Sequence, residues 1–133
     1  MPRAVILDTD IGTDIDDTWA LGMLMNCPEV DLKAVVSTHA DTEYRASLVA
    51  KLLEVWSRTD VAVGVGKVGE ALSVLPQSEF LGTYTFEDYT GFATSDGVGL
   101  LIDTIMSVEE PVVLSIGPTT NIAAALELSL IHI

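Results

Sequence analysis

The fold depends on one stretch near the N-terminus, Ala4-Val5-Ile6-Leu7-Asp8-Thr9-Asp10-Ile11-Gly12-Thr13-Asp14-Ile15-Asp16-Asp17. Four apolar residues lead into a turn that contains Gly12, and apolar residues then recur at helical spacing from Asp16 to Met25. This order predicts a buried strand, a tight turn and a helix.

Five of the ten residues from 8 to 17 are aspartates. Two carboxylates ~4 Å apart repel by about 4 kcal/mol where the effective dielectric is near 20, so a bound cation would relieve the cluster. All candidate ligands here carry oxygen, and none is Cys or His, which favours Ca²⁺ or Mg²⁺. Helix capping would explain Asp14 or Asp16. It does not explain Asp8 and Asp10 at the strand end, so a metal or catalytic site is the preferred interpretation.

Strands and helices alternate along the rest of the chain. Strands are predicted at residues 5–8, 32–37, 61–65 and 112–116, and helices at residues 16–26, 42–57 and 121–128. This alternation favours a doubly wound, mostly parallel α/β sheet. The second helix is expected to turn four apolar residues inward: Leu48, Leu52, Val55 and Trp56.

Residues 66–96 follow neither the helical nor the strand period. A segment of that length is either a functional lid or an insertion without a role. Its aromatic residues either stack on a flat ligand or pack the segment down. These residues are Tyr84, Phe86, Tyr89 and Phe92.

The composition limits the partners and the compartment. Six Lys and Arg stand against 20 Asp and Glu in 133 residues, and the formal charge of −14 argues against nucleic acid or an anionic membrane as a partner. The single cysteine, Cys27, cannot form an internal disulfide, and the N-terminus has no signal-peptide pattern, so a cytoplasmic location is expected. Asn121 and Glu127 interrupt the apolar C-terminal stretch, so no membrane span is predicted.

Ligands of open parallel sheets bind beyond the carboxyl ends of the strands. The aspartate cluster follows the first predicted strand, and His39 and Asp41 follow the second. Asp41 is either a helix cap or a ligand contact, whereas His39 is typical of a surface or packing residue. The last predicted strand leads into Ile116-Gly117-Pro118-Thr119-Thr120-Asn121.

These segments together resemble the inosine–uridine-preferring nucleoside hydrolase family. Asp8-Thr9-Asp10-Ile11-Gly12, followed by Asp16-Asp17, is similar to its Asp-x-Asp-Pro-Gly-x-Asp-Asp signature, with Ile11 for Pro and two extra residues before the final pair. Residues 35–42 resemble its Thr-x-x-x-Gly-Asn or Gly-Asp turn, and residues 117–123 resemble its Gly-Pro-Leu-Thr-Asn segment. The resemblance implies that residues 1–128 are the N-terminal part of a single nucleoside hydrolase domain.

The resemblance also implies an activity, namely Ca²⁺-dependent hydrolysis of the N-glycosidic bond of a ribonucleoside to ribose and free base, by a homo-oligomer when full length. Asp16 would be the general base that activates water, and the two-residue insertion leaves Asp14 as its rival. Asp41 and Asp14 would bind ribose hydroxyls. The implied calcium ligands are the carboxylates of Asp10 and Asp17 and the backbone carbonyl of Ile116.

The chain departs from the family in two respects. Ala40 stands where the family has glycine, which puts the backbone angle there in question. Family members are also more than twice as long, so the chain is interpreted as truncated. A further Asp ligand, the group that assists the leaving base and most base contacts would then be absent, and residues 1–133 alone are expected to be inactive. Residues 129–133 are interpreted as a non-native tail.

Two other functions stay open at this point. A haloacid-dehalogenase-like phosphatase would use Asp8 as nucleophile, Asp10 as acid/base and Mg²⁺ as cofactor, but its motif requires Thr or Val at the position of Gly12. A non-catalytic calcium-binding module is the other. An EF-hand starting at Asp8 fails, because Thr13 occupies the required glycine position and Trp19 the position of the bidentate glutamate.

Overall fold

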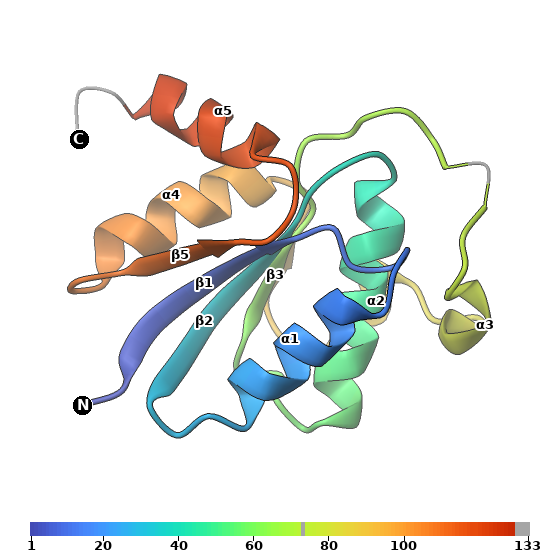
Figure 1. Ribbon diagram of the computed structural model, residues 1–133, viewed down its shortest axis with the longest axis horizontal. Coiled ribbons are helices and arrows are strands. Elements are labelled where there is room, and N and C mark those ends of the chain that lie inside the picture. Colours follow the sequence, from blue (N-terminus) through green and yellow to red (C-terminus); the bar gives the residue numbers. More distant parts are fainter. Residues whose placement is uncertain (73, 130–133) are drawn as a thin grey trace.

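The computed structural model describes residues 1–72 and 74–129, and within them a five-stranded sheet has the order β4-β3-β2-β1-β5 (Figure 1). All four strand pairs are parallel. The strands are β1 (Arg3–Thr9), β2 (Val30–Ser37), β3 (Ala62–Gly64), β4 (Ala93–Thr94) and β5 (Val112–Ser115). The helices are α1 (Asp16–Met25), α2 (Thr42–Val55), α3 (Ser78–Leu81), η1 (Phe86–Asp88), α4 (Gly97–Ser107) and α5 (Thr120–Leu128).

Helices cover both faces of the sheet. One core cluster joins β1 residues such as Leu7 to α1 and α2, and a second cluster joins β1 residues such as Ile6 to α4 and α5. Figure 1 shows α1 and α2 on one side of the sheet and α4 and α5 on the other. The predicted doubly wound, parallel α/β fold is therefore confirmed.

The strand order places β1 between β2 and β5, and the chain crosses from one side of β1 to the other. Such a reversal opens a crevice at the carboxyl ends of the strands, where ligands of this architecture bind. The aspartate cluster follows β1 directly, so it lies at this point.

The buried face of α2 differs from the prediction. Val55 is 62% exposed and Trp56 is 37% exposed, so their predicted burial is wrong. The stripe that faces the sheet consists of Ala46, Val49, Ala50 and Leu53, at helical spacing. Small alanines let the helix approach the strands closely, and a search for bulky apolar residues overlooks them.

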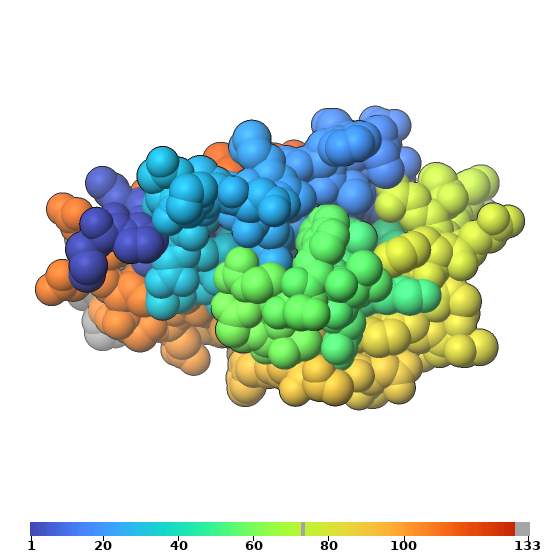
Figure 2. All heavy atoms as spheres, turned by 90° about the horizontal axis from the view of Figure 1, so that it is seen from below, coloured from blue at the N-terminus to red at the C-terminus, as the bar shows by residue number. Residues whose placement is uncertain are grey.

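The segment from residue 66 to residue 96 contains α3, η1 and β4. No helix is predicted from the sequence where α4 follows this segment. Tyr89 is buried and its hydroxyl donates to the carbonyl of Val61 at 2.6 Å. Tyr84 and Phe86 pack against the same core, whereas Phe92 is exposed. Three of the four aromatic residues thus pack the segment down, and Figure 2 shows the residues around α3 lying against α2.

None of the helices in the described ranges has the length and apolar character that spanning a bilayer requires. The interpretation of residues 129–133 as a tail falls, except for Ser129, outside the described residues.

Gly66 lies just after β3, and its contacts with Ser37 and Asn121 provide a test of packing. A Cβ at this position would collide with the carbonyl oxygen of Ser37 and the side chain of Asn121. Gly66→Ala is expected to lower the free energy of unfolding by about 1–3 kcal/mol, measured by urea denaturation. Gly22→Ala is the matched control, because its Cβ would lie 3.6 Å from Trp56 in ordinary contact and within a helix. The control is expected to be stabilising by about 0.5–1 kcal/mol, and an equal loss in both variants would contradict this account.

Candidate functional site

Asp8 lies completely buried at the end of β1. Its carboxylate accepts hydrogen bonds from Asn121 Nδ2 at 2.8 Å and from Ser115 Oγ at 3.3 Å. Asn121 Nδ2 also donates to the carbonyl of Ser37 at 2.9 Å. Burial raises the pKa of Asp8 above its ordinary value, while both side-chain hydrogen bonds lower it. The Asp8 carboxylate therefore connects β1 to β5 and α5, and Asn121 extends this connection to β2.

Asp10 and Asp17 form a carboxylate pair at the mouth of the strand. Asp17 is buried and accepts a hydrogen bond from Thr9 Oγ1 at 2.5 Å. Its pKa is raised to about 6, mainly by burial; the Thr9 hydrogen bond opposes this rise, and the neighbouring carboxylates of Asp10 and Asp16 add to it. Two negative charges that lie close together where solvent is partly excluded favour the binding of a cation between them.

The turn after β5 lies against Asp10. A Cβ on Gly117 would stand 3.1 Å from Asp10 Cβ and 2.7 Å from Thr38 Cγ2, so only glycine fits this approach. Thr38 Oγ1 donates to the carbonyl of Pro118 at 2.9 Å, and the N–H of Ile116 donates to the carbonyl of Asp8 at 2.9 Å. The predicted backbone ligand Ile116 thus belongs to a turn that packs on Asp10.

Asp14 and Asp16 are both exposed at the start of α1. Ile15 is the N-cap residue of this helix, and no side chain caps it through a hydrogen bond. Neither carboxylate therefore caps the helix through a hydrogen bond, whereas Asp16 lies in the first turn, where an acidic residue complements the helix dipole. Asp16 also lies near enough to Asp17 to raise the Asp17 pKa.

Asp41 caps α2, because its Oδ1 accepts a hydrogen bond from the N–H of Tyr44 at 3.1 Å. The half-buried Asp41 stays a prediction as a ribose contact. The turn before it is strained, since His39 has φ 74° and Ala40 has φ 56°. Ala40 therefore adopts the left-handed conformation that favours the glycine of the family pattern.

The donor chemistry of this site fits a hard cation, since the Asp10 and Asp17 carboxylates and nearby carbonyls are all oxygens. No group of three or more His, Cys, Asp or Glu in residues 1–72 and 74–129 is arranged to hold a metal ion. The Asp10 and Asp17 carboxylates alone supply fewer than the 6–8 oxygens that Ca²⁺ takes.

Sequence reasoning missed Arg45, which is completely buried and donates to the backbone carbonyl of Asp10 at 2.6 Å. It also missed Tyr44, whose hydroxyl donates to the carbonyl of Gly12 at 2.9 Å. The partners of both side chains are backbone groups, which no sequence pattern reveals. The burial of Arg45 does have a signal in the sequence. Arg45 lies four residues before Val49, and this spacing places both on the buried face of α2.

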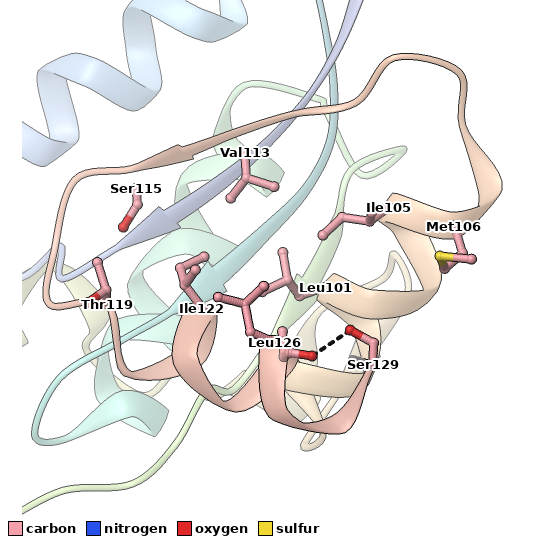
Figure 3. A pocket seen from close by; sticks show the side chains of 10 residues that line it. Leu101, Ile105, Met106, Val113, Ser115, Thr119, Ile122, Leu126 and Ser129 are labelled. Carbon is pink, nitrogen blue, oxygen red and sulfur yellow. Dashed lines mark hydrogen bonds between the residues drawn. The ribbon is translucent and has the colours of Figure 1, made fainter. Parts of the chain in front are cut away.

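An apolar hollow of about 310 Å³ lies between α4, β5 and α5 (Figure 3). Leu101, Val113 and Ile122 line it, and no charged side chain does. Among the lining residues, Ser115 donates a hydrogen bond to the carboxylate of Asp8. The hollow therefore lacks groups for acid–base or metal chemistry, and the candidate site is the carboxylate cluster.

Comparisons with known proteins identify the family of the chain. A family model described as inosine-uridine preferring nucleoside hydrolase matches residues 5–129. The chain therefore belongs to the inosine-uridine preferring nucleoside hydrolase family. The two alternatives, a haloacid-dehalogenase-like phosphatase and a non-catalytic calcium-binding module, gain no support from these comparisons.

Three proteins similar to this chain are nucleoside hydrolases. The pyrimidine-specific ribonucleoside hydrolase RihA of Escherichia coli O1:K1 / APEC is 30% identical over 136 residues, which cover 95% of this chain and 43% of the relative. A plant nucleoside hydrolase, the PpNRh1 enzyme, is 26% identical with a TM-score of 0.76 over 96% of this chain and 43% of its own. An inosine-guanosine nucleoside hydrolase shares the fold at 22% identity, with a TM-score of 0.77 over 98% of this chain and 44% of its own. The chain spans less than half the length of these relatives.

The raised pKa of Asp17 predicts how stability depends on pH when calcium is absent. The folded protein keeps the Asp17 proton up to about pH 6, whereas the unfolded chain loses it near pH 3.8. The folded state then binds more protons between these values, so the Asp17 contribution to the unfolding free energy falls as the pH rises from about 4 to about 6. The loss is at most about 3 kcal/mol, at about 1.4 kcal/mol per pKa unit.

Asp17→Asn is therefore expected to be more stable than the wild type at pH 7.5 in a chelator, and not at pH 4, as measured by urea denaturation. Asp60→Asn is the control with the opposite sign, because hydrogen bonding to Arg58 lowers the Asp60 pKa. A less stable Asp17→Asn variant at pH 7.5 would contradict the prediction.

Proposed function

We propose that the complete protein is a calcium-dependent nucleoside hydrolase that cleaves the N-glycosidic bond of a ribonucleoside. The observation that carries this proposal is the Asp10–Asp17 carboxylate pair, placed beside the Gly117 turn in a chain of the nucleoside hydrolase family. Membership of that family and the 30% identity to a ribonucleoside hydrolase support the reaction class.

The chemistry of the reaction needs carboxylates of this kind. Cleavage of a ribosyl bond passes through an oxocarbenium-like state, which a nearby carboxylate stabilises while another group activates water. We keep Asp16 as the proposed general base, with Asp14 as its rival, since both are exposed and lie close in sequence to the buried Asp17. Asp10 is a third candidate, because it adjoins Asp17 and the Gly117 turn at the centre of the site.

Calcium would be held by the carboxylates of Asp10 and Asp17 and by the carbonyl of Ile116, together with ligands from beyond the matched part of the family fold. When bound, Ca²⁺ would lower the pKa of water and orient the ribose diol. Asp41 would accept a hydrogen bond from a ribose hydroxyl, and its cap on α2 fixes its direction.

The substrate class is a nucleoside, and uridine is the first choice because the RihA relative is named as pyrimidine-specific. Inosine is the second, because the family description names it. A homo-oligomeric state and a cytoplasmic location stay predictions.

The test is to incubate the complete gene product with uridine and with inosine and to identify the products by chromatography. Free base and ribose in equal amounts are expected. Phosphate release from a phosphomonoester, with no free base from either nucleoside, would replace this proposal by the phosphatase alternative.

A further inference from the structure

Arg45 is the largest side chain that the described part of the protein buries completely. The ion pairs within residues 1–72 and 74–129 join Lys33 to Asp31 and Arg58 to Asp60, so no carboxylate there pairs with Arg45. A buried cation without an opposite charge is costly in a protein core. Stability alone is therefore a poor explanation for an arginine at this place.

The guanidinium of Arg45 reaches two turns at once. Its Nη1 donates to the carbonyls of Asp10 at 2.6 Å and Ile11 at 2.9 Å, in the turn after β1. Its Nε donates to the carbonyl of His39 at 2.8 Å, in the turn after β2. Nη2 is buried and has no hydrogen-bond partner among the residues described. One rigid fork thus connects the segments that carry Asp10 and Asp41.

Each of the two turns has an energetically unfavourable feature that such a connection would oppose. The turn after β1 leads the Asp10 carboxylate to that of Asp17, and like charges push it away. The turn after β2 holds His39 and Ala40 at positive φ, which is unfavourable for residues with a Cβ. Donors directed at the carbonyls of these turns fix the backbone against both tendencies.

We propose that Arg45 is a positioning residue that locks the turn after β1 to the turn after β2, so that Asp10, Asp17 and Asp41 keep their spacing before a ligand binds. Arg45 is fully buried and acts through the backbone of Asp10, Ile11 and His39. The inference rests on the proposed function, which assigns these carboxylates to calcium and ribose.

The test is calorimetric titration of the complete gene product with Ca²⁺ alone, using Arg45→Met and Arg45→Lys, with Arg58→Met as the control at the opposite end of the sheet. Arg45→Met is expected to weaken calcium binding about 10- to 100-fold, as loss of a supporting contact behind metal ligands does. Arg45→Lys is expected to fall between, because one ammonium reaches the carbonyls of one turn and lacks the planar fork. The Arg58→Met control is expected to bind calcium with wild-type affinity. Wild-type calcium affinity in both folded Arg45 variants would overturn the proposal.

A measurement on the wild type decides the case if the Arg45 variants fail to fold. The N–H groups of Ile11 and Thr38 donate to the Thr9 side chain and carbonyl. In calcium-free wild-type protein they are expected to be protected from hydrogen exchange, and exchange at the rate of an unstructured chain would overturn the proposal. Calcium binding without nucleoside cleavage would remove the proposed reaction and leave the Arg45 result valid. If the wild type binds no calcium, the exchange measurement alone decides on Arg45.

Discussion

Asp10→Asn is expected to lower kcat of the complete enzyme on uridine or inosine by about 10²- to 10⁴-fold, the range that a general base contributes. The substitution keeps the shape of the side chain but removes the charge of the carboxylate next to Asp17. Asp10 is a proposed calcium ligand and a candidate base, so its loss affects the reaction under either assignment. The measurement is steady-state kinetics of ribose release at saturating Ca²⁺.

Asp16→Asn then distinguishes Asp16 from Asp10 as the base. If Asp16 is the base, kcat falls by a similar factor while calcium affinity is unchanged. If Asp10 is the base, Asp16→Asn keeps most of its turnover. Asp103→Asn, an exposed aspartate on α4, is the control and is expected to match the wild type. An Asp10→Asn variant with wild-type kcat would contradict the assignment of this carboxylate to the site.

Asn121→Ala is expected to lower the free energy of unfolding by about 3 kcal/mol or more. Asn121 is completely buried and bonds three groups: its amide nitrogen donates to Asp8 and to the Ser37 carbonyl, and its carbonyl oxygen accepts from the N–H of Lys67 at 2.9 Å. Each buried group left without a partner costs about 1–3 kcal/mol, and more when it is charged. Urea denaturation of the complete gene product measures the loss.

Asn26→Ala is the matched control for this prediction. Asn26 is exposed and its side-chain amide donates to one carbonyl, that of Gly22, at 2.8 Å. The control is expected to lose about 1 kcal/mol or less. Equal losses in the two variants would show that the network around Asp8 does not hold the strand ends together.

The position of the candidate site follows from local signals in the sequence. An apolar strand that ends in Asp8-Thr9-Asp10 shows where the strand meets the crevice, and parallel topology brings the segments after the other strands to the same edge. The structure places Gly117 against Asp10 as that argument requires.

The rest depends on contacts that the sequence does not reveal. Helix α4 begins at Gly97, and a Cβ there would stand 2.8 Å from Val36, so its place follows from close packing on the sheet. The packing role of Tyr89 depends on a hydrogen bond to Val61, 28 residues away. The role of Arg45 depends on backbone carbonyls in two turns that lie far from each other in the sequence.

The most direct test of the central claim is a titration of the complete gene product, stripped of divalent ions, with Ca²⁺ while ribose release from uridine and inosine is followed. Saturable, calcium-dependent turnover of at least one nucleoside is expected, and Asp17→Asn is expected to lose it although its calcium-free fold is more stable at neutral pH. Turnover that a chelator leaves unchanged, or an Asp17→Asn enzyme with wild-type calcium dependence, would contradict the account.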